Sequence, residues 1–149
     1  MKKFRFRLDR LLELKRSYER MKREEIGRIK SQIDQIELER KRKFEEMLEE
    51  ENKFRKDGSQ IHTMIYRLKY IRGLKEDIDE LEMKRRRIEE LLKREIEEYL
   101  KLQRERKIYD RLRERRYREY VMETERETMN FLDDVSMRKY HFNDGRGKG

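Results

Sequence analysis

Asp57-Gly58-Ser59 is the one clear break between two long stretches of helix-forming sequence. Gly58 suits the left-handed position that ends a helix, and Ser59 can cap the start of a second one. Proline, which would interrupt an internal helical turn, is absent from all 149 residues. We therefore expect an all-α fold, with a helix over residues 4–56, a turn at 57–59 and a helix over residues 60–136.

Composition limits how much of these helices can be buried. Charged residues make up 52% of the chain and apolar residues only 34%, whereas compact domains are nearly half apolar. A thick core of several layers is therefore excluded. The chain contains no cysteine, which rules out disulfides and thiolate metal sites and fits a reducing cytoplasm. No apolar run is long enough to span a membrane or to serve as a signal peptide.

Apolar residues recur at three- and four-residue steps along both stretches, the spacing of a coiled coil. In the first stretch these residues are Leu8, Leu12, Ile26, Ile29, Ile33, Ile36, Met47 and Phe54, and the same seam takes in Lys15, Glu19, Lys22, Arg40, Lys43 and Glu50. In the second they are Ile61, Met64, Leu68, Ile71, Leu74, Ile78, Leu81, Ile88, Leu92, Tyr99, Leu102, Tyr109 and Tyr120. Two successive three-residue steps from Leu68 to Leu74 are interpreted as a stammer, a local overwinding.

These features predict a long antiparallel two-helix coiled-coil hairpin. If it folds about the Gly58–Ser59 bond, facing residues have numbers that sum to about 117. Lys22 then faces Glu95 and Arg40 faces Asp77, so two of the seam cations meet an opposite charge. The apolar pairs predicted by this register are Leu8 with Tyr109, Ile26 with Leu91, Ile29 with Ile88, Ile36 with Leu81, and Met47 with Tyr70.

The two arms are expected to be unequal, because residue 4 would lie near residue 113 and the second helix continues beyond it. Apolar residues on this overhang would then have no partner within the hairpin; they are Tyr117, Tyr120, Val121, Met122, Met129, Phe131 and Leu132. We assign residues 1–142 to one hairpin domain and expect the tail, residues 143–149, to be disordered.

Positive charge gathers where the two termini would meet. Of the net charge of +9, residues 1–30 contribute +7 and residues 101–126 contribute +4, while the remaining segments nearly balance. A concentrated field of this kind steers the open end towards an acidic partner; a solvated charged face is the alternative interpretation. Nucleic acid is disfavoured, because glutamates are interleaved with the basic residues, as in Arg113-Glu114-Arg115-Arg116.

Chemistry typical of enzymes is missing from the sequence. His62 and His141 are the only histidines, and they lie near opposite ends of the second helix, so no transition-metal site is expected. Pairs of glutamates on a solvated helix lack the burial that tunes a carboxylate for acid–base catalysis. We expect neither a catalytic site nor a cofactor.

Three segments together resemble the FliJ family of flagellar type III export proteins. The first is Phe4-x-Phe6-x-Leu8-x-x-Leu11-Leu12 at the start of the chain. The second, Tyr66-x-x-x-Tyr70-Ile71-x-x-Leu74-x-x-x-Ile78, follows the turn. The third is Asn130-Phe131-Leu132-Asp133-Asp134, near the C-terminus.

The resemblance implies a non-enzymatic, monomeric stalk that is cytoplasmic and peripherally associated with the flagellar basal body at the inner membrane. Its open end would enter the central hole of a hexameric export ATPase, and its turn would contact the cytoplasmic domain of the membrane export gate. Export chaperones are further partners that it implies. The stalk of a needle-type secretion system and a structural or self-associating coiled coil stay open as alternatives.

Candidate contact residues follow from this resemblance. For the export gate they are Phe54, Tyr70 and Leu74. For the ATPase ring they are Phe4, Phe6, Leu8, Arg116, Tyr117, Tyr120, Phe131 and Leu132.

Overall fold

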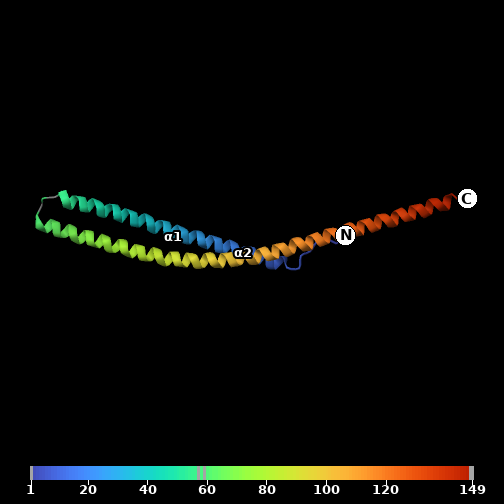
Figure 1. The fold of residues 1–149 in the computed structure, drawn as a ribbon, viewed down its shortest axis with the longest axis horizontal. Helices are drawn as coiled ribbons and strands as arrows, with labels where there is room; N and C mark the ends of the chain where they lie inside the picture. Colours follow the sequence, from blue (N-terminus) through green and yellow to red (C-terminus); the bar gives the residue numbers. More distant parts are fainter. Residues whose placement is uncertain (1, 57, 59, 148–149) are drawn as a thin grey trace. The chain divides into compact units, whose positions relative to one another are not determined.

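The computed structural model describes residues 2–56, 58 and 60–147, and shows two long helices packed against each other (Figure 1). Helix α1 spans Asp9–Lys56 and helix α2 spans Ile61–Arg146. The described residues contain no β-strand. The predicted all-α, two-helix fold is therefore confirmed. Over the same residues, neither helix contains a segment that is apolar enough to cross a membrane.

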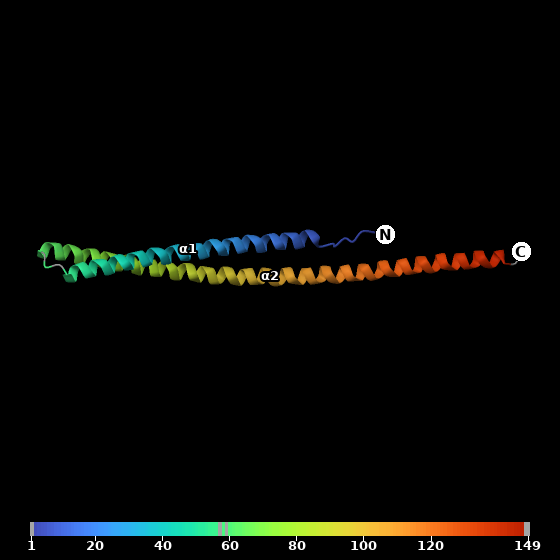
Figure 2. The same cartoon turned by 90° about the horizontal axis from the view of Figure 1, so that it is seen from above.

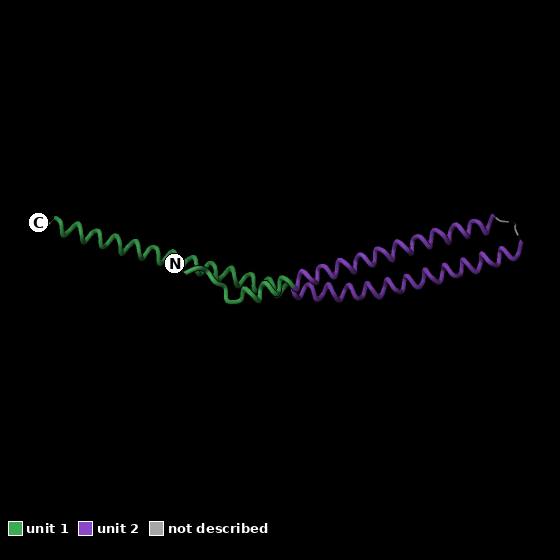
Figure 3. The backbone as a smooth tube through the Cα atoms, turned by 180° about the vertical axis from the view of Figure 1, so that it is seen from behind, with its two compact units in different colours: residues 1–17, 103–149 green, residues 18–102 purple. Residues whose placement is uncertain are grey.

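The chain divides into two compact units (Figure 3). Unit 2 is Tyr18–Leu102 and contains most of α1, the connection between the helices and the first half of α2. Unit 1 combines Met1–Ser17 with Gln103–Gly149. Unit 1 is thus built from two segments that are far apart in the sequence, whereas unit 2 is one continuous segment.

In unit 2 the two helices run antiparallel and side by side, as two perpendicular views show (Figures 1 and 2). Every described α1 residue of this unit that is buried or half-buried belongs to the predicted seam, except Glu51. The buried seam residues of α1 within unit 2 are Glu19, Ile26, Ile29, Ile36 and Met47. Near the connection, Met47 packs with Ile71 and Leu74 of α2, and Ile78 covers this cluster.

The predicted stammer in α2 is wrong. Leu68 is 50% exposed, and the neighbouring Arg67 lies half-buried in the seam instead. Arg67 is stabilised there by Glu50 of α1, with 3.9 Å between its Nε and a carboxylate oxygen. Met64, Arg67, Ile71 and Leu74 then follow the regular alternation of three- and four-residue steps. Choosing seam positions by hydrophobicity alone therefore assigned Leu68, rather than the neighbouring Arg67, to the seam.

The register prediction is confirmed at one ion pair and wrong at the other. The Lys22 Nζ lies 2.5 Å from a Glu95 carboxylate oxygen, as predicted. Arg40 instead pairs with Glu82 at 2.5 Å, and Asp77 pairs with Lys43 at 3.0 Å. Long side chains reach about one helical turn along the partner helix, so a sum of residue numbers does not define which charges meet.

Two predicted apolar pairs are also displaced. Leu91 is 40% exposed and Leu92 is half-buried, so Leu92 rather than Leu91 occupies the seam near Ile26. Tyr70 is 40% exposed, and Met47 packs instead against the next residue, Ile71. In both cases the seam position lies one residue further along α2. The remaining three apolar pairs stay predictions.

Gln60 begins α2 in the way that a capping residue does. Its carbonyl oxygen accepts hydrogen bonds from the backbone N–H of Thr63 at 3.0 Å and of Met64 at 3.3 Å. The predicted cap, Ser59, and Asp57 lie outside the described residues. Gly58 is described, and no described glycine has a positive φ, so the left-handed conformation expected there is not found.

Unit 1 contains the start of α1 and the C-terminal end of α2, and both differ from the prediction. Helix α1 begins at Asp9 rather than at residue 4. Helix α2 passes the predicted end at 136 and runs to Arg146, so residues 143–146 of the expected disordered tail are helical. No proline or glycine interrupts the sequence between 137 and 144, so no residue there ends the helix. Residues 148–149 lie outside the described residues.

Candidate partner-binding site

Residues 2–8 form a strap, which is extended over residues 2–6 and turns at residues 7–8 before α1 begins. The alternating sequence explains the extended part. Phe4, Phe6 and Leu8 alternate with Lys3, Arg5 and Arg7, which is the period of an extended chain rather than of a helix. Phe6 is buried and Phe4 and Leu8 are half-buried, whereas the three cations are exposed. Continuing the α1 heptads backwards would have put Arg5 in the seam and Phe6 outside it. The extended conformation buries Phe6 and half-buries Phe4.

The strap turns into α1 at a closely packed corner. The Asp9 N–H donates to the Phe6 carbonyl at 3.2 Å, and the Leu12 N–H donates to the Leu8 carbonyl at 2.9 Å, which starts the helical hydrogen bonding. Leu12 is only 1% exposed. Across the corner, the Asp9 carboxylate accepts a 3.1 Å hydrogen bond from the Nε of Arg113 in α2. These contacts fix the direction in which the strap leaves α1.

Aromatic rings hold the far end of the strap against α2. The Phe4 ring meets Tyr117 edge-on at 5.2 Å between centroids and lies 5.5 Å from Tyr120. The Tyr120 hydroxyl donates a 2.6 Å hydrogen bond to the backbone carbonyl of Lys2. The Arg113 guanidinium lies 5.8 Å from the centroid of the Phe4 ring. Tyr117 and Tyr120, expected to lack partners, are therefore packed against the chain's own N-terminus.

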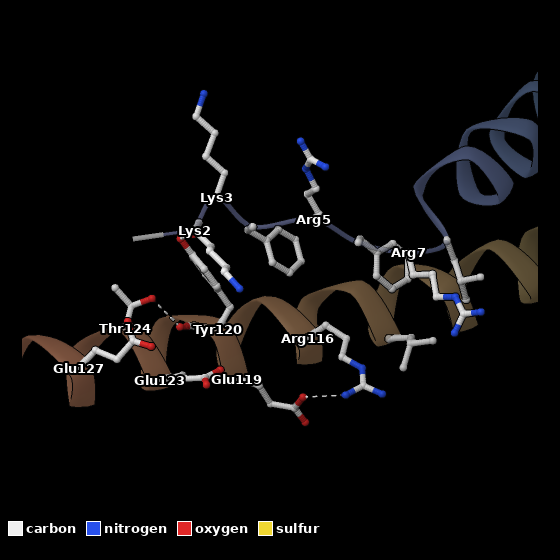
Figure 4. A pocket seen from close by; sticks show the side chains of 14 residues that line it. Lys2, Lys3, Arg5, Arg7, Arg116, Glu119, Tyr120, Glu123, Thr124 and Glu127 are labelled. Carbon is white, nitrogen blue, oxygen red and sulfur yellow. Dashed lines mark hydrogen bonds and ion pairs between the residues drawn. The ribbon is translucent and has the colours of Figure 1, made fainter.

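A groove of about 1410 Å³ lies between the strap and α2 (Figure 4), and we call it the strap groove. Its α2 lining extends from Leu112 to Glu127. Five extended residues span roughly 17 Å at about 3.3 Å each, which corresponds to about 11 residues of helix at 1.5 Å each. The extended strap therefore follows more of α2 than a helical N-terminus could.

The lining of the strap groove is apolar at its base and charged along its sides. Phe4, Phe6, Leu8 and Leu112 supply the apolar part. Of the strap cations, Lys3 and Arg5 point away from α2 and Lys2 points towards it, while Glu119, Glu123 and Glu127 supply the charged lining from α2 (Figure 4). Arg116 donates to Glu119 at 3.1 Å. An elongated protein segment with both apolar and charged side chains matches this surface better than a small compact ligand does.

Ion pairs brace α1 against α2 next to the strap groove. The Asp110 carboxylate accepts hydrogen bonds from Arg16 at 2.8 Å and from Arg106 at 2.7 Å. Burial disfavours the charged form of Asp110, but these two guanidinium groups outweigh it and hold its pKa below the ordinary value of 3.8. Lys15 adds a 2.5 Å ion pair with Glu105. The strap groove is thus built on a fixed helix pair.

Most of the predicted ATPase-contact residues converge on this site. Phe4, Phe6, Leu8, Arg116 and Tyr120 line the strap groove, and Tyr117 packs on Phe4 beside it. Phe131 and Leu132 lie further along α2 and are 67% and 53% exposed. Sequence reasoning missed Lys2, Lys3, Arg5, Arg7 and the α2 glutamates as lining residues. The alternation of aromatic and basic residues from Lys3 to Leu8 was the signal that could have found the strap.

The three predicted gate-contact residues are placed differently from one another. Leu74 is buried in the cluster with Met47 and Ile71, so it stabilises the helix pair and is not presented to solvent. Phe54 is half-buried in the α1 seam. Tyr70 is exposed, and its hydroxyl donates a hydrogen bond to Glu46, which raises the tyrosine pKa. Of the three, Tyr70 offers the most accessible surface.

A comparison with protein families identifies the chain. The family model described as "Flagellar FliJ protein" matches residues 4–145, nearly its whole length. The chain belongs to the FliJ family. Searches of curated proteins and of solved structures found no match. FliJ membership makes this a flagellar export-related protein, and the matched range includes the strap from Phe4 onward, both helices and the residues that line the strap groove.

Proposed function

We propose that the chain is the stalk of the flagellar export apparatus, with its strap groove and the adjoining α2 segment engaging a hexameric export ATPase. The main support for this proposal is that one groove is lined by five residues expected to contact the ATPase: Phe4, Phe6, Leu8, Arg116 and Tyr120. The matched family supports the flagellar rather than the needle-type system. The proposed role is non-enzymatic and requires no cofactor.

The chemistry of this end of the molecule supports insertion into a ring. A single helix with a strap laid along it is narrow enough for an axial hole that would exclude a globular domain. Residues 1–30 and 101–126 carry net charges of +7 and +4. Exposed positive charge speeds encounter with an acidic surface and is screened over about 10 Å at 0.1 M salt. An acidic entrance to the ring is the matching partner surface.

At the connection between the helices, we propose contact with the cytoplasmic domain of the export gate. Tyr70 is its main anchor and Phe54 adds apolar surface, while Leu74 keeps the two helices packed. A tyrosine at the surface of a highly charged helix pair is a typical interface anchor. Export chaperones are further proposed partners.

The proposal is tested by mixing the full chain with the flagellar export ATPase of the same organism and measuring complex formation by gel filtration. A complex that contains the ATPase hexamer is expected. For the gate, Tyr70→Ala should weaken binding to the gate's cytoplasmic domain. Tyr18→Ala, which alters a tyrosine that is 50% exposed against 40% for Tyr70, should not. If the chain bound neither the ATPase nor the gate domain, the stalk assignment would be wrong.

Self-association is a second candidate function, favoured by the apolar surface of α2 beyond the strap groove. Large apolar side chains that are more than half exposed follow one another there; they are Met129, Phe131, Leu132, Met137, Tyr140 and Phe142. Such a surface usually has a partner. The molecular mass in dilute solution separates the candidates: a stalk is a monomer, and a self-associating coil is a dimer or larger.

A further inference from the structure

The two flanks of the unit 2 helix pair can be told apart by the contacts that cross each of them. On one flank, the Glu51 carboxylate lies 3.9 Å from the Lys75 Nζ. Both residues directly follow a seam residue in their helix. On the other flank, Tyr70 donates a hydrogen bond to Glu46. Both of these residues directly precede a seam residue. Because the helices are antiparallel coiled-coil partners, residues of the same kind share one flank.

We call the flank with the Glu51–Lys75 pair the apolar flank. Over residues 41–55 and 64–75, the residues that come directly after a seam residue are Lys41, Phe44, Leu48, Glu51, Arg55, Ile65, Leu68, Arg72 and Lys75. Four of these are large apolar residues, which are between 42% and 50% exposed: Phe44, Leu48, Ile65 and Leu68. Ile61, one turn before Ile65 and 73% exposed, extends the same row.

The opposite flank has a different character. Over the same two ranges, the residues that directly precede a seam residue are Arg42, Glu46, Glu49, Lys53, Tyr66, Tyr70 and Gly73. They include no aliphatic side chain. Both flanks expose aromatic rings, but only the apolar flank exposes aliphatic side chains, and a coiled coil that only had to remain in solution would have no reason for that difference. The difference therefore marks the apolar flank as an interaction surface.

Charge on the apolar flank defines the partner's chemistry. Around the apolar row stand four cations, Lys41, Arg55, Arg72 and Lys75, against one anion, Glu51. A partner that buries the apolar row without placing like charges together must carry carboxylates along its edges. The surface between two packed helices accepts a third helix, which turns the pair into a three-helix bundle.

We propose that the apolar flank docks an amphipathic helix of a partner protein, with an apolar face for Phe44, Leu48, Ile65 and Leu68 and with acidic residues along its edges. This inference goes beyond the stalk function. It uses neither the strap groove nor Tyr70, which lies on the other flank. The partner helix adds to the α1–α2 pair without separating it, because the residues it covers lie outside the seam.

The test uses the full chain and two fluorescent synthetic peptides, each an amphipathic helix with leucines at its core positions. One peptide has glutamates along both edges, and the other has lysines there. Fluorescence anisotropy should show binding of the glutamate peptide at least about tenfold tighter than that of the lysine peptide. Reversing the charge at two positions, with Lys41→Glu and Arg72→Glu, should make the lysine peptide bind more tightly than the glutamate peptide. Equal affinity for both peptides would overturn the proposal.

A second pair of variants locates the binding surface. Leu48→Asp combined with Leu68→Asp should weaken binding of the glutamate peptide by at least about tenfold, because both substitutions put a carboxylate in the apolar row. Leu38→Asp is the matched control: this leucine is 51% exposed and lies on the outer face of α1, between the flanks. Circular dichroism checks that the helices persist. Equal affinity loss in the control, or none in the double variant, would place binding elsewhere and overturn the proposal.

Discussion

The hydroxyl of Tyr120 in α2 donates a 2.6 Å hydrogen bond to the backbone carbonyl of Lys2. Residues 118 positions apart in the sequence are thereby joined at the far end of the strap. The bond is directed to the backbone, so it needs an extended N-terminus rather than a particular side chain at position 2. Together with Phe4 on Tyr117, it decides where the strap lies and which part of α2 it covers.

Removing the Phe4 ring should release the strap. Phe4→Ala removes the packing against Tyr117 and Tyr120, and aromatic pairs of this kind contribute about 0.5–1.5 kcal/mol beyond their buried area. Amide hydrogen exchange of residues 2–8 should become faster, while exchange in α1 near Ile29 should not change. Phe44→Ala, which removes a ring outside the strap, is the control. Unchanged exchange in Phe4→Ala would show that the ring does not hold the strap.

Reversing the charge of Lys22 should destabilise the helix pair, and reversing Glu95 as well should restore part of the loss. The Lys22 Nζ lies 2.5 Å from both Glu95 and Glu98, and these carboxylates raise its pKa. We expect a coupling energy of roughly 1–3 kcal/mol. This is above the usual value of about 0.2–1 kcal/mol for exposed pairs, because both side chains are mostly buried. A double-mutant cycle of urea denaturation measures it, and zero coupling would contradict the observed pair.

Asp110 should make the stability of unit 1 depend on acid pH. Its pKa in the folded chain lies below the ordinary 3.8, because hydrogen bonds from Arg16 and Arg106 outweigh burial. A lowered folded pKa means that the contribution is present above the unfolded pKa, near 4, and is lost as pH falls through the folded value.

Asp110→Asn provides the comparison for this prediction. The variant should be less stable than the original chain at pH 7, and the difference should shrink as the pH falls below about 4. Urea denaturation at pH 7, 5 and 3 gives the free energies of unfolding. A stability difference that stays the same at all three pH values would mean that the Asp110 carboxylate does not contribute through its charge.

Periodicity was sufficient to predict the seam of α1, including its charged members. Glu19 and Lys22 were placed in the seam by spacing alone, and Glu19 is 4% exposed. In α2 the same reasoning used apolar character to choose between neighbours, and it selected Leu68 over Arg67. Spacing is the better guide there, because a charge in a thin seam finds a partner on the facing helix.

The strap groove depends on information that the heptad spacing does not contain. Leu8 fits both a helix that continues α1 backwards and an extended chain that buries alternate residues. Which of the two conformations forms depends on whether Phe4 and Phe6 can reach apolar surface. That surface is supplied by Tyr117 and Tyr120, more than a hundred residues later in the sequence. The aromatic residues of α2 were found from the sequence, but their partner was not.

The most direct test of the stalk account is the rate of ATP hydrolysis by the flagellar export ATPase in the presence of the chain. Deleting residues 117–149 removes Tyr117, Tyr120 and everything beyond them, and deleting only 143–149 is the control. We predict that the control stimulates hydrolysis like the full chain, whereas the longer deletion abolishes stimulation and leaves binding to the gate domain intact. Full stimulation by the longer deletion would contradict the assignment of this end to the ATPase ring.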